Sequence, residues 1–289
     1  MASIYEHGIY TKEQPTGMVA PVMGTAGLQV IVGTAPVHML ADPAAAVNKP
    51  LLVQSYKEAV AAVGYSDDFA AFTLCESISA NFSVVGVAPL VLINVLDPVK
   101  HSTDLTETTV QVNSGVAVVA ETGVLPDKLV VKSGDVELAR DTDYITAWGS
   151  DGAINIVLVE GGAGDGATVL TITGKKLDPG KVTAADIIGG VDIATGDETG
   201  LEVIRQVYPK FGLTPGILLA PRFSADPAVA AALQAKTKEI NGVYRAVCIV
   251  DVDSTQEGAT KYTDVKEQKE KQVLTDPNAY GVWLYGKVG

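Results

Sequence analysis

Apolar and polar positions along the chain follow two different patterns. Residues 28–97 and 184–289 alternate between short apolar runs and segments with an apolar side chain at every third or fourth position, the pattern of strands and helices in an α/β protein. Residues 98–183 instead contain short strand-like runs separated by turn residues such as Asp151-Gly152. The sequence therefore predicts a discontinuous α/β core domain with a mostly parallel sheet, interrupted by an inserted β-domain.

The first half of the predicted core contains two buried strands, Leu28 to Gly33 and Pro89 to Leu96. The second shows no polar alternation, as expected for a strand of a parallel sheet that is covered on both faces. Helices are expected between them over residues 55–63 and 67–82. The second helix carries apolar side chains at spacings of three and four, which predicts a buried face; they are Phe72, Cys75, Ile78 and Phe82.

Two well-marked helices are expected in the second half of the core. In the first, Thr199 and Glu202 have the spacing of a capping box, and Gly212 is the expected terminator. The second is expected to begin with Asp226 as N-cap and Pro227 as the first helical residue. These signals predict where each helix begins.

Apolar runs follow these helices at 217–220, 246–250 and 282–285 and are the predicted strands. A third helix, over 261–272, is polar almost all round and should be largely solvated. An order of strand, helix and strand implies right-handed crossovers and a mostly parallel sheet.

The insertion is predicted to be a small antiparallel sandwich or barrel, because its strand-like runs are short and closely spaced. These runs are Val110–Val112, Lys128–Lys132, Val136–Ala139, Tyr144–Trp148, Ile154–Val159 and Val169–Thr173. The glycine-rich segment Gly161–Gly166 precedes a strand, whereas a phosphate-binding loop must open a helix. We therefore expect this segment to be a hairpin turn.

Residues 1–27 show neither the helical nor the strand period of apolar positions, and they are predicted to form an extended N-terminal arm. The arm contains more apolar side chains than a solubilising tail needs. We expect it to pair with the sheet edge of a neighbouring subunit. The predicted contact residues are Ile4, Tyr5, Ile9, Tyr10, Met18, Val19 and Val22.

Charge and composition exclude several classes of partner. The chain carries 21 basic and 34 acidic residues, and the net charge of −13 repels nucleic acids and anionic membrane surfaces. The longest apolar run, Val84 to Leu96, is too short to span a bilayer. Cys75 and Cys248 lack metal-ligand or redox spacing and are expected to be buried thiols.

Candidate chemical groups are few and scattered. Asp251 and Asp253 follow a predicted strand, where doubly wound folds place active sites, but nothing else in the sequence supports catalysis there. Arg222 and Arg245 are expected to form ion pairs between domains or subunits. The histidines, His7, His38 and His101, have no ligand spacing and are expected at the surface. The sequence therefore predicts no catalytic, cofactor-binding or metal-binding residue.

Several motifs in order resemble the contractile tail sheath proteins of phages and related injection machines, and the resemblance covers essentially the whole chain. The motifs are Glu6-His7-Gly8-Ile9, Thr16-Gly17, Val32-Gly33-Thr34-Ala35, Asp143-Tyr144 with the Asp151-Gly152 turn, Ala185–Gly190 with Thr199–Glu202, and Pro215–Pro221. Each motif alone is short. Their common order and spacing carry the resemblance.

The resemblance implies a structural subunit of the virion tail, without cofactor or enzymatic activity, assembled in the host cytoplasm. Such subunits form a helical homo-oligomeric sheath around an inner tail tube, meet baseplate proteins, and contract to drive the tube through a target envelope. Sheath proteins continue past the last strand into a part that faces the tube, whereas this chain stops at Gly289. The resemblance therefore indicates a shortened form.

Functions of two other classes remain open at the level of sequence. A surface-binding module built on the β-domain would need exposed aromatic side chains, and the segment offers mainly Tyr144 and Trp148. An α/β enzyme would need a pocket that gathers Asp251, Asp253 and Arg222 at the strand ends.

Overall fold

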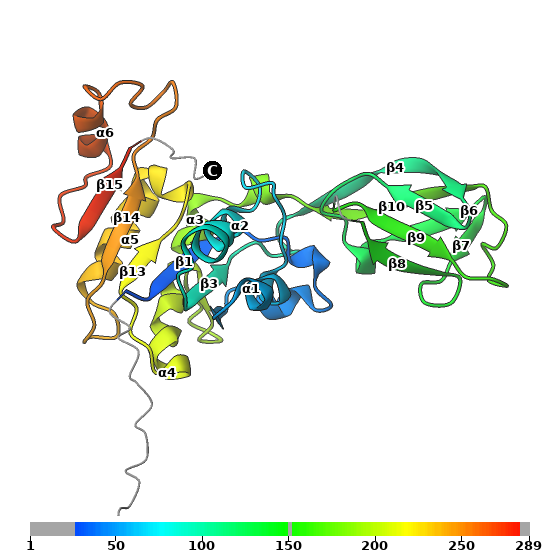
Figure 1. Cartoon of the computed structure of the whole chain (residues 1–289), viewed down its shortest axis with the longest axis horizontal. Coiled ribbons are helices and arrows are strands. Elements are labelled where there is room, and N and C mark those ends of the chain that lie inside the picture. Colours follow the sequence, from blue (N-terminus) through cyan, green and yellow to red (C-terminus); the bar gives the residue numbers. More distant parts are fainter. Residues whose placement is uncertain (1–26, 150–151, 284–289) are drawn as a thin grey trace, which may run out of the picture.

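Two β-sheets organise the computed structural model, which describes residues 27–149 and 152–283 (Figure 1). Strands from both sides of the insertion form a six-stranded sheet, and strands within the insertion form a seven-stranded sheet. The predicted fold class, an α/β core interrupted by an antiparallel β-insertion, is confirmed. Residues 1–26 of the predicted arm lie outside the described residues.

The six-stranded sheet joins the two halves of the chain at its centre. Its order is β15-β14-β13-β1-β3-β2, and every pairing is parallel except that of β2 with β3. Because β1 lies between β3 and β13, strands from before and after the insertion meet on its two sides. The strands are β1 Gln29–Gly33, β2 Pro50–Val53, β3 Leu90–Asn94, β13 Ile217–Leu219, β14 Val247–Asp251 and β15 Ala279–Val282.

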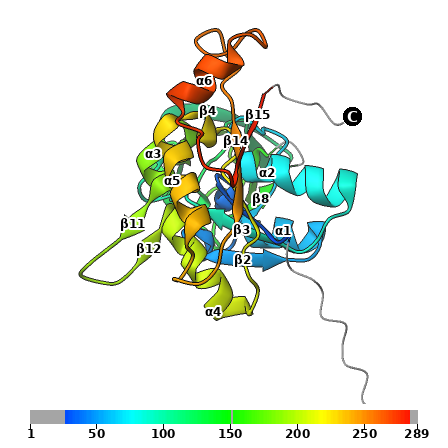
Figure 2. The same cartoon turned by 90° about the vertical axis from the view of Figure 1, so that its left-hand side faces the viewer.

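Helices cover both faces of this sheet, with α3 and α5 on one face and α1 and α2 on the other (Figure 2). This explains the apolar runs 30–32 in β1 and 90–93 in β3, since a strand covered on both faces has no solvent side. The α-helices are α1 Tyr56–Val63, α2 Thr73–Ile78, α3 Ala184–Ile188, α4 Val207–Phe211, α5 Pro227–Lys238 and α6 Val265–Lys271. None of the described helices is long and apolar enough to cross a membrane.

Short helical turns complete the secondary structure. The 3₁₀ turns are Val37–Met39, Pro43–Ala46, Pro126–Lys128, Pro179–Lys181, Gly200–Gln206 and Phe223–Ala225, and a π-helical segment over Ser79–Val85 continues α2. The prediction for α5 is confirmed, because the Asp226 carboxylate accepts hydrogen bonds from the amides of Ala228 and Val229.

Two helix starts differ from the prediction because side chains bind the backbone locally. The helix expected from residue 67 begins at Thr73, since the Asp68 side chain accepts a hydrogen bond from the Ala71 amide and holds this segment in a turn. Thr199 forms no capping box, because its hydroxyl accepts a hydrogen bond from the Gly190 amide at 3.1 Å. A 3₁₀ turn therefore replaces the expected α-helical start.

The predicted polar helix is shorter than expected and is tied to the sheet. α6 begins at Val265, and Gln272 just after it is fully buried. The Gln272 side-chain amide donates hydrogen bonds to the carbonyl oxygens of Asp251 at 2.8 Å and Ala225 at 3.0 Å. A single amide thus fixes an otherwise solvated helix to the end of β14. The last strand also begins earlier than predicted, at Ala279 instead of residue 282.

The seven-stranded sheet is antiparallel and curls around its own core, in the order β7-β6-β10-β4-β5-β9-β8. Its strands are β4 Ser102–Asn113, β5 Val116–Val119, β6 Val130–Ser133, β7 Val136–Leu138, β8 Tyr144–Trp148, β9 Ile154–Leu158 and β10 Val169–Leu177. β5 was not predicted. The predicted hairpin turn at Gly161–Gly166 is wrong, because it links β9 to β10, which are not neighbours in the sheet.

A small hairpin, β11 Gly190–Val191 and β12 Glu198–Thr199, follows α3 and projects from the core (Figure 2). It was not predicted. It lies between the two motifs, Ala185–Gly190 and Thr199–Glu202, whose spacing contributed to the family resemblance.

We propose that residues 98–183 form a domain between core segments 28–97 and 184–289, because the insertion surrounds a hydrophobic cluster separate from that of the α/β core. The excised segment 98–183 should then fold alone and give a dispersed amide NMR spectrum. A collapsed spectrum from the soluble segment would contradict these boundaries.

Candidate functional site

The two connections between the sheets lie side by side. The Asp178 amide donates a hydrogen bond to the His101 carbonyl oxygen at 2.8 Å, and the Lys181 ammonium donates to the Ser102 carbonyl oxygen at 2.6 Å. The outgoing and returning segments are thus hydrogen-bonded where the insertion leaves the core. We treat this junction as the candidate functional site, because both chain connections between the sheets pass through it.

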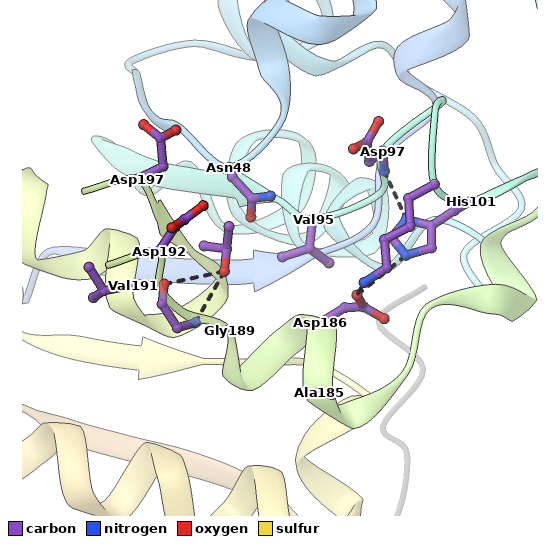
Figure 3. A pocket seen from close by; sticks show the side chains of 13 residues that line it. Asn48, Val95, Asp97, His101, Ala185, Asp186, Gly189, Val191, Asp192 and Asp197 are labelled. Carbon is purple, nitrogen blue, oxygen red and sulfur yellow. Dashed lines mark hydrogen bonds and ion pairs between the residues drawn. The ribbon is translucent and has the colours of Figure 1, made fainter. Parts of the chain in front are cut away.

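Asp186, on α3, is the central group of the junction (Figure 3). Its side chain is only 8% exposed and forms an ion pair with Lys100. The same carboxylate accepts hydrogen bonds from the Thr183 amide at 2.8 Å and the Thr183 hydroxyl at 2.7 Å. Burial alone would raise the pKa of Asp186, but these donors together hold the pKa well below its usual range.

His101 completes the cluster and is buried, so the prediction of a surface histidine is wrong. Its Nδ1 accepts a hydrogen bond from the Asp97 amide at 3.0 Å. In the neutral ring the proton is therefore on Nε2, which faces Asp186 Oδ1 at 3.5 Å. The histidine is a structural link between the end of the core strand segment and α3.

A cavity of about 540 Å³ opens beside this cluster, between α3 and the base of the β11–β12 hairpin. Asp192 and Asp197 add carboxylates to its rim. No group of three or more histidine, cysteine, aspartate or glutamate side chains placed to hold a metal occurs in the described residues. The arrangement is suited to fixing the junction through hydrogen bonds and ion pairs.

A second contact between the sheets is made by His38, which is also buried, contrary to the prediction. Its ring meets Trp148 of β8 edge-on, with centroids 5.3 Å apart, and lies 6.1 Å from Phe72 of the core. Burial lowers the pKa of His38 from 6.5 to about 4. Tyr144 is buried and Trp148 half-buried, so the aromatic side chains considered for a binding surface are used in packing.

The candidate strand-end groups are occupied by structural bonds. One Asp251 carboxylate oxygen accepts hydrogen bonds from the Arg222 amide at 2.7 Å and the Ser224 hydroxyl at 2.8 Å. The Asp253 carboxylate accepts from the Thr255 amide at 2.9 Å. The Arg222 guanidinium pairs with Glu76 at 3.3 Å, within the core and not between domains. These contacts fix the loop after β13 to the end of β14.

Arg245 is exposed, and no ion pair involving it is found in the part of the chain that the structure describes. Both cysteines are buried free thiols, as predicted. Burial raises the pKa of Cys75 to about 12 and of Cys248 to about 11, so neither is a reactive thiolate at neutral pH. His7 and the seven predicted arm contacts lie outside the described residues.

Comparison with known proteins gives two relatives of the same kind. The chain is 31% identical over 248 residues, 84% of its length, to the tail sheath protein of Burkholderia phage BcepMu. It is 32% identical over 118 residues, 40% of its length, to a putative prophage major tail sheath protein of Pseudomonas aeruginosa. The chain is a homologue of phage tail sheath proteins. No protein-family model matches it.

This homology confirms the resemblance inferred from the sequence motifs. The chain spans 48% of the BcepMu tail sheath protein and 29% of the Pseudomonas aeruginosa protein. Tail sheath proteins are structural components of the virion tail. The homology therefore supports the prediction that the chain is not an enzyme.

The position of His38 predicts a pH dependence of stability. Because its pKa is about 4 in the folded chain and 6.5 when unperturbed, the unfolded chain binds one more proton between these values. The free energy of unfolding should be highest above pH 6.5 and should fall by about 1.4 kcal/mol per unit of pH toward pH 4. Urea denaturation of the wild type and of His38→Phe across this range measures the effect.

The substitution keeps an aromatic ring in contact with the packing partners of His38 and removes the titrating group. The free energy of unfolding of His38→Phe should depend less steeply on pH than that of the wild type, and the difference in slope should correspond to one bound proton. Parallel curves for the two proteins would show that His38 does not titrate in this way.

Proposed function

We propose that the chain is a structural subunit of a contractile tail sheath, assembled as a helical homo-oligomer around an inner tail tube. Contraction of this assembly would drive the tube through a target cell envelope. The observation that carries the proposal is the homology to the BcepMu tail sheath protein over 84% of the chain. The inner tube and the baseplate proteins are the further partners we propose.

The free edges of the core sheet support a role in assembly. β15 is the outermost strand at one edge, and it exposes Tyr280, which is 57% accessible, and Val282. An edge strand offers unpaired backbone groups to which an extended segment can add. We propose that residues 1–27 of one subunit add to such an edge of a neighbour through Ile4, Tyr5, Ile9, Tyr10, Met18, Val19 and Val22.

Linkage by extended arms is compatible with a large rearrangement of the subunits. An arm that pairs through its backbone keeps two subunits connected while their other interfaces are exchanged. Repetition around a ring adds many such contacts without strengthening any single one. The energy for contraction would be stored in the metastable assembly and released as interfaces change, with no nucleotide consumed.

Deletion of residues 1–24 tests this assembly scheme. The deleted full-length protein should remain a folded, soluble monomer with an unchanged circular dichroism spectrum, because the arm sequence shows no helical or strand period of its own. It should no longer form tubes in negative-stain electron microscopy. Undeleted protein, prepared in parallel, should form rings or tubes.

Intact tubes from the deleted protein would show that the arm is not needed for assembly. A failure of the undeleted full-length protein to form any ring or tube would instead count against the sheath function itself.

A further inference from the structure

The β11–β12 hairpin presents an isoleucine entirely to solvent. Ile193, in the turn, is 99% exposed, the highest value among the large exposed apolar side chains of the described residues. The turn is well connected: the Asp192 amide donates to the Asp197 carbonyl oxygen at 2.8 Å, and the Gly196 amide donates to the Asp192 carbonyl oxygen at 2.7 Å. Ile193 is therefore held outward on an ordered turn.

Two glycines fix the base of this hairpin. A Cβ atom at Gly189 would lie 1.8 Å from the Thr199 carbonyl oxygen, and one at Gly200 would lie 2.3 Å from the Ile187 carbonyl oxygen. Both glycines also have positive φ angles, 66° and 57°. The backbones before and after the hairpin can approach this closely only without side chains, and this approach sets its direction.

The surroundings of Ile193 are acidic. Asp192 and Asp197 flank it in the turn, and both are exposed. The Asp192 carboxylate also accepts a hydrogen bond from the Ala194 amide at 2.8 Å, which fixes its position. The hairpin tip is thus an apolar side chain between two carboxylates.

A groove of complementary character lies beside the base of the hairpin, around α4 and the turn before β14, and Glu198 of β12 also lines it. It has a volume of about 680 Å³. Tyr208 and Tyr244 pack together in it with ring centroids 4.8 Å apart, and Val243 beside them is 75% exposed. Two basic residues, Arg205 and Lys210, also line the groove.

Of the two basic residues, Lys210 leaves positive charge available in the groove, because Arg205 is paired with glutamates. Arg205 is 3.4 Å from Glu198 and 4.0 Å from Glu202, whereas Lys210 is exposed and has no ion pair in the described part of the chain. Most of the surface of a chain with a net charge of −13 repels an acidic hairpin tip. An exposed apolar groove with an unpaired lysine attracts the tip more strongly than that surface does.

We propose that the hairpin tip of one subunit docks into the tyrosine groove of a second copy of this chain, with Ile193 against Tyr208, Val243 and Tyr244. Asp197 would then approach Lys210. The inference rests on the proposed self-assembly and names the surfaces of one contact. Because tip and groove are different surfaces, the contact is heterologous and repeats from subunit to subunit into a ring or helix.

Engineered cysteines test the contact directly. Native Cys75 and Cys248 are fully buried, so exposed cysteines can be oxidised selectively. Full-length protein carrying both Ile193→Cys and Val243→Cys should give a ladder of disulfide-linked oligomers under mild oxidation on a non-reducing gel. Each single variant should give at most a dimer, because one thiol can link only one neighbour.

A matched control replaces Val243→Cys by Val99→Cys, since Val99 is 87% exposed but lies at the junction. The control pair should give at least about tenfold less oligomer, because position 99 lies outside the proposed groove and a thiol there is not held within disulfide distance of position 193. Equal ladders from the two pairs, or no ladder from the first, would overturn the proposed contact.

Charge reversal adds an independent test. In the paired-cysteine protein, Asp197→Lys should slow cross-linking by about three- to tenfold, and adding Lys210→Glu should restore it. A ladder from a protein that forms no tubes would support the proposed contact and contradict the proposed sheath function. Tubes without a ladder would retain the sheath function and overturn the contact.

Discussion

The structure depends on the two ends of the insertion lying close together. The insertion begins after β3 and ends before α3, and β1 must still pair with β3 on one side and with β13 on the other. Asp186 meets this constraint, because its buried carboxylate binds Lys100 from the outgoing segment and Thr183 from the returning one. Hydrogen bonds between the two connections reinforce the same point.

The sheets are joined by at least two kinds of contact. The first is the polar junction around Asp186, and the second is the packing of His38 against Trp148. The strand-end acid Asp251 is engaged by the Arg222 amide and the Ser224 hydroxyl. This organisation agrees with the homology to a structural family.

The sequence predicted what local patterns determine. β1 and β3 contain continuous apolar runs, and Asp226 with Pro227 marks the start of α5, so these elements were predictable from neighbouring residues alone. The candidate site was largely missed. His38 and His101 are buried by segments far away in the sequence, and the hydroxyl of Thr199 binds Gly190 instead of capping a helix. The burial and the bonding of these side chains depend on tertiary contacts, which cannot be inferred from the periodicity of apolar positions.

The most direct test of the junction is hydrogen exchange and urea denaturation of Asp186→Asn. The free energy of unfolding should fall by about 1–3 kcal/mol, because the substitution removes a buried charged acceptor. Amides in 97–102 and 177–189 should exchange faster, while those of β1 and β3 stay protected. Asp197→Asn, an exposed acid on the same cavity, is the control and should change neither measurement. Unchanged exchange at the junction in Asp186→Asn would contradict this account.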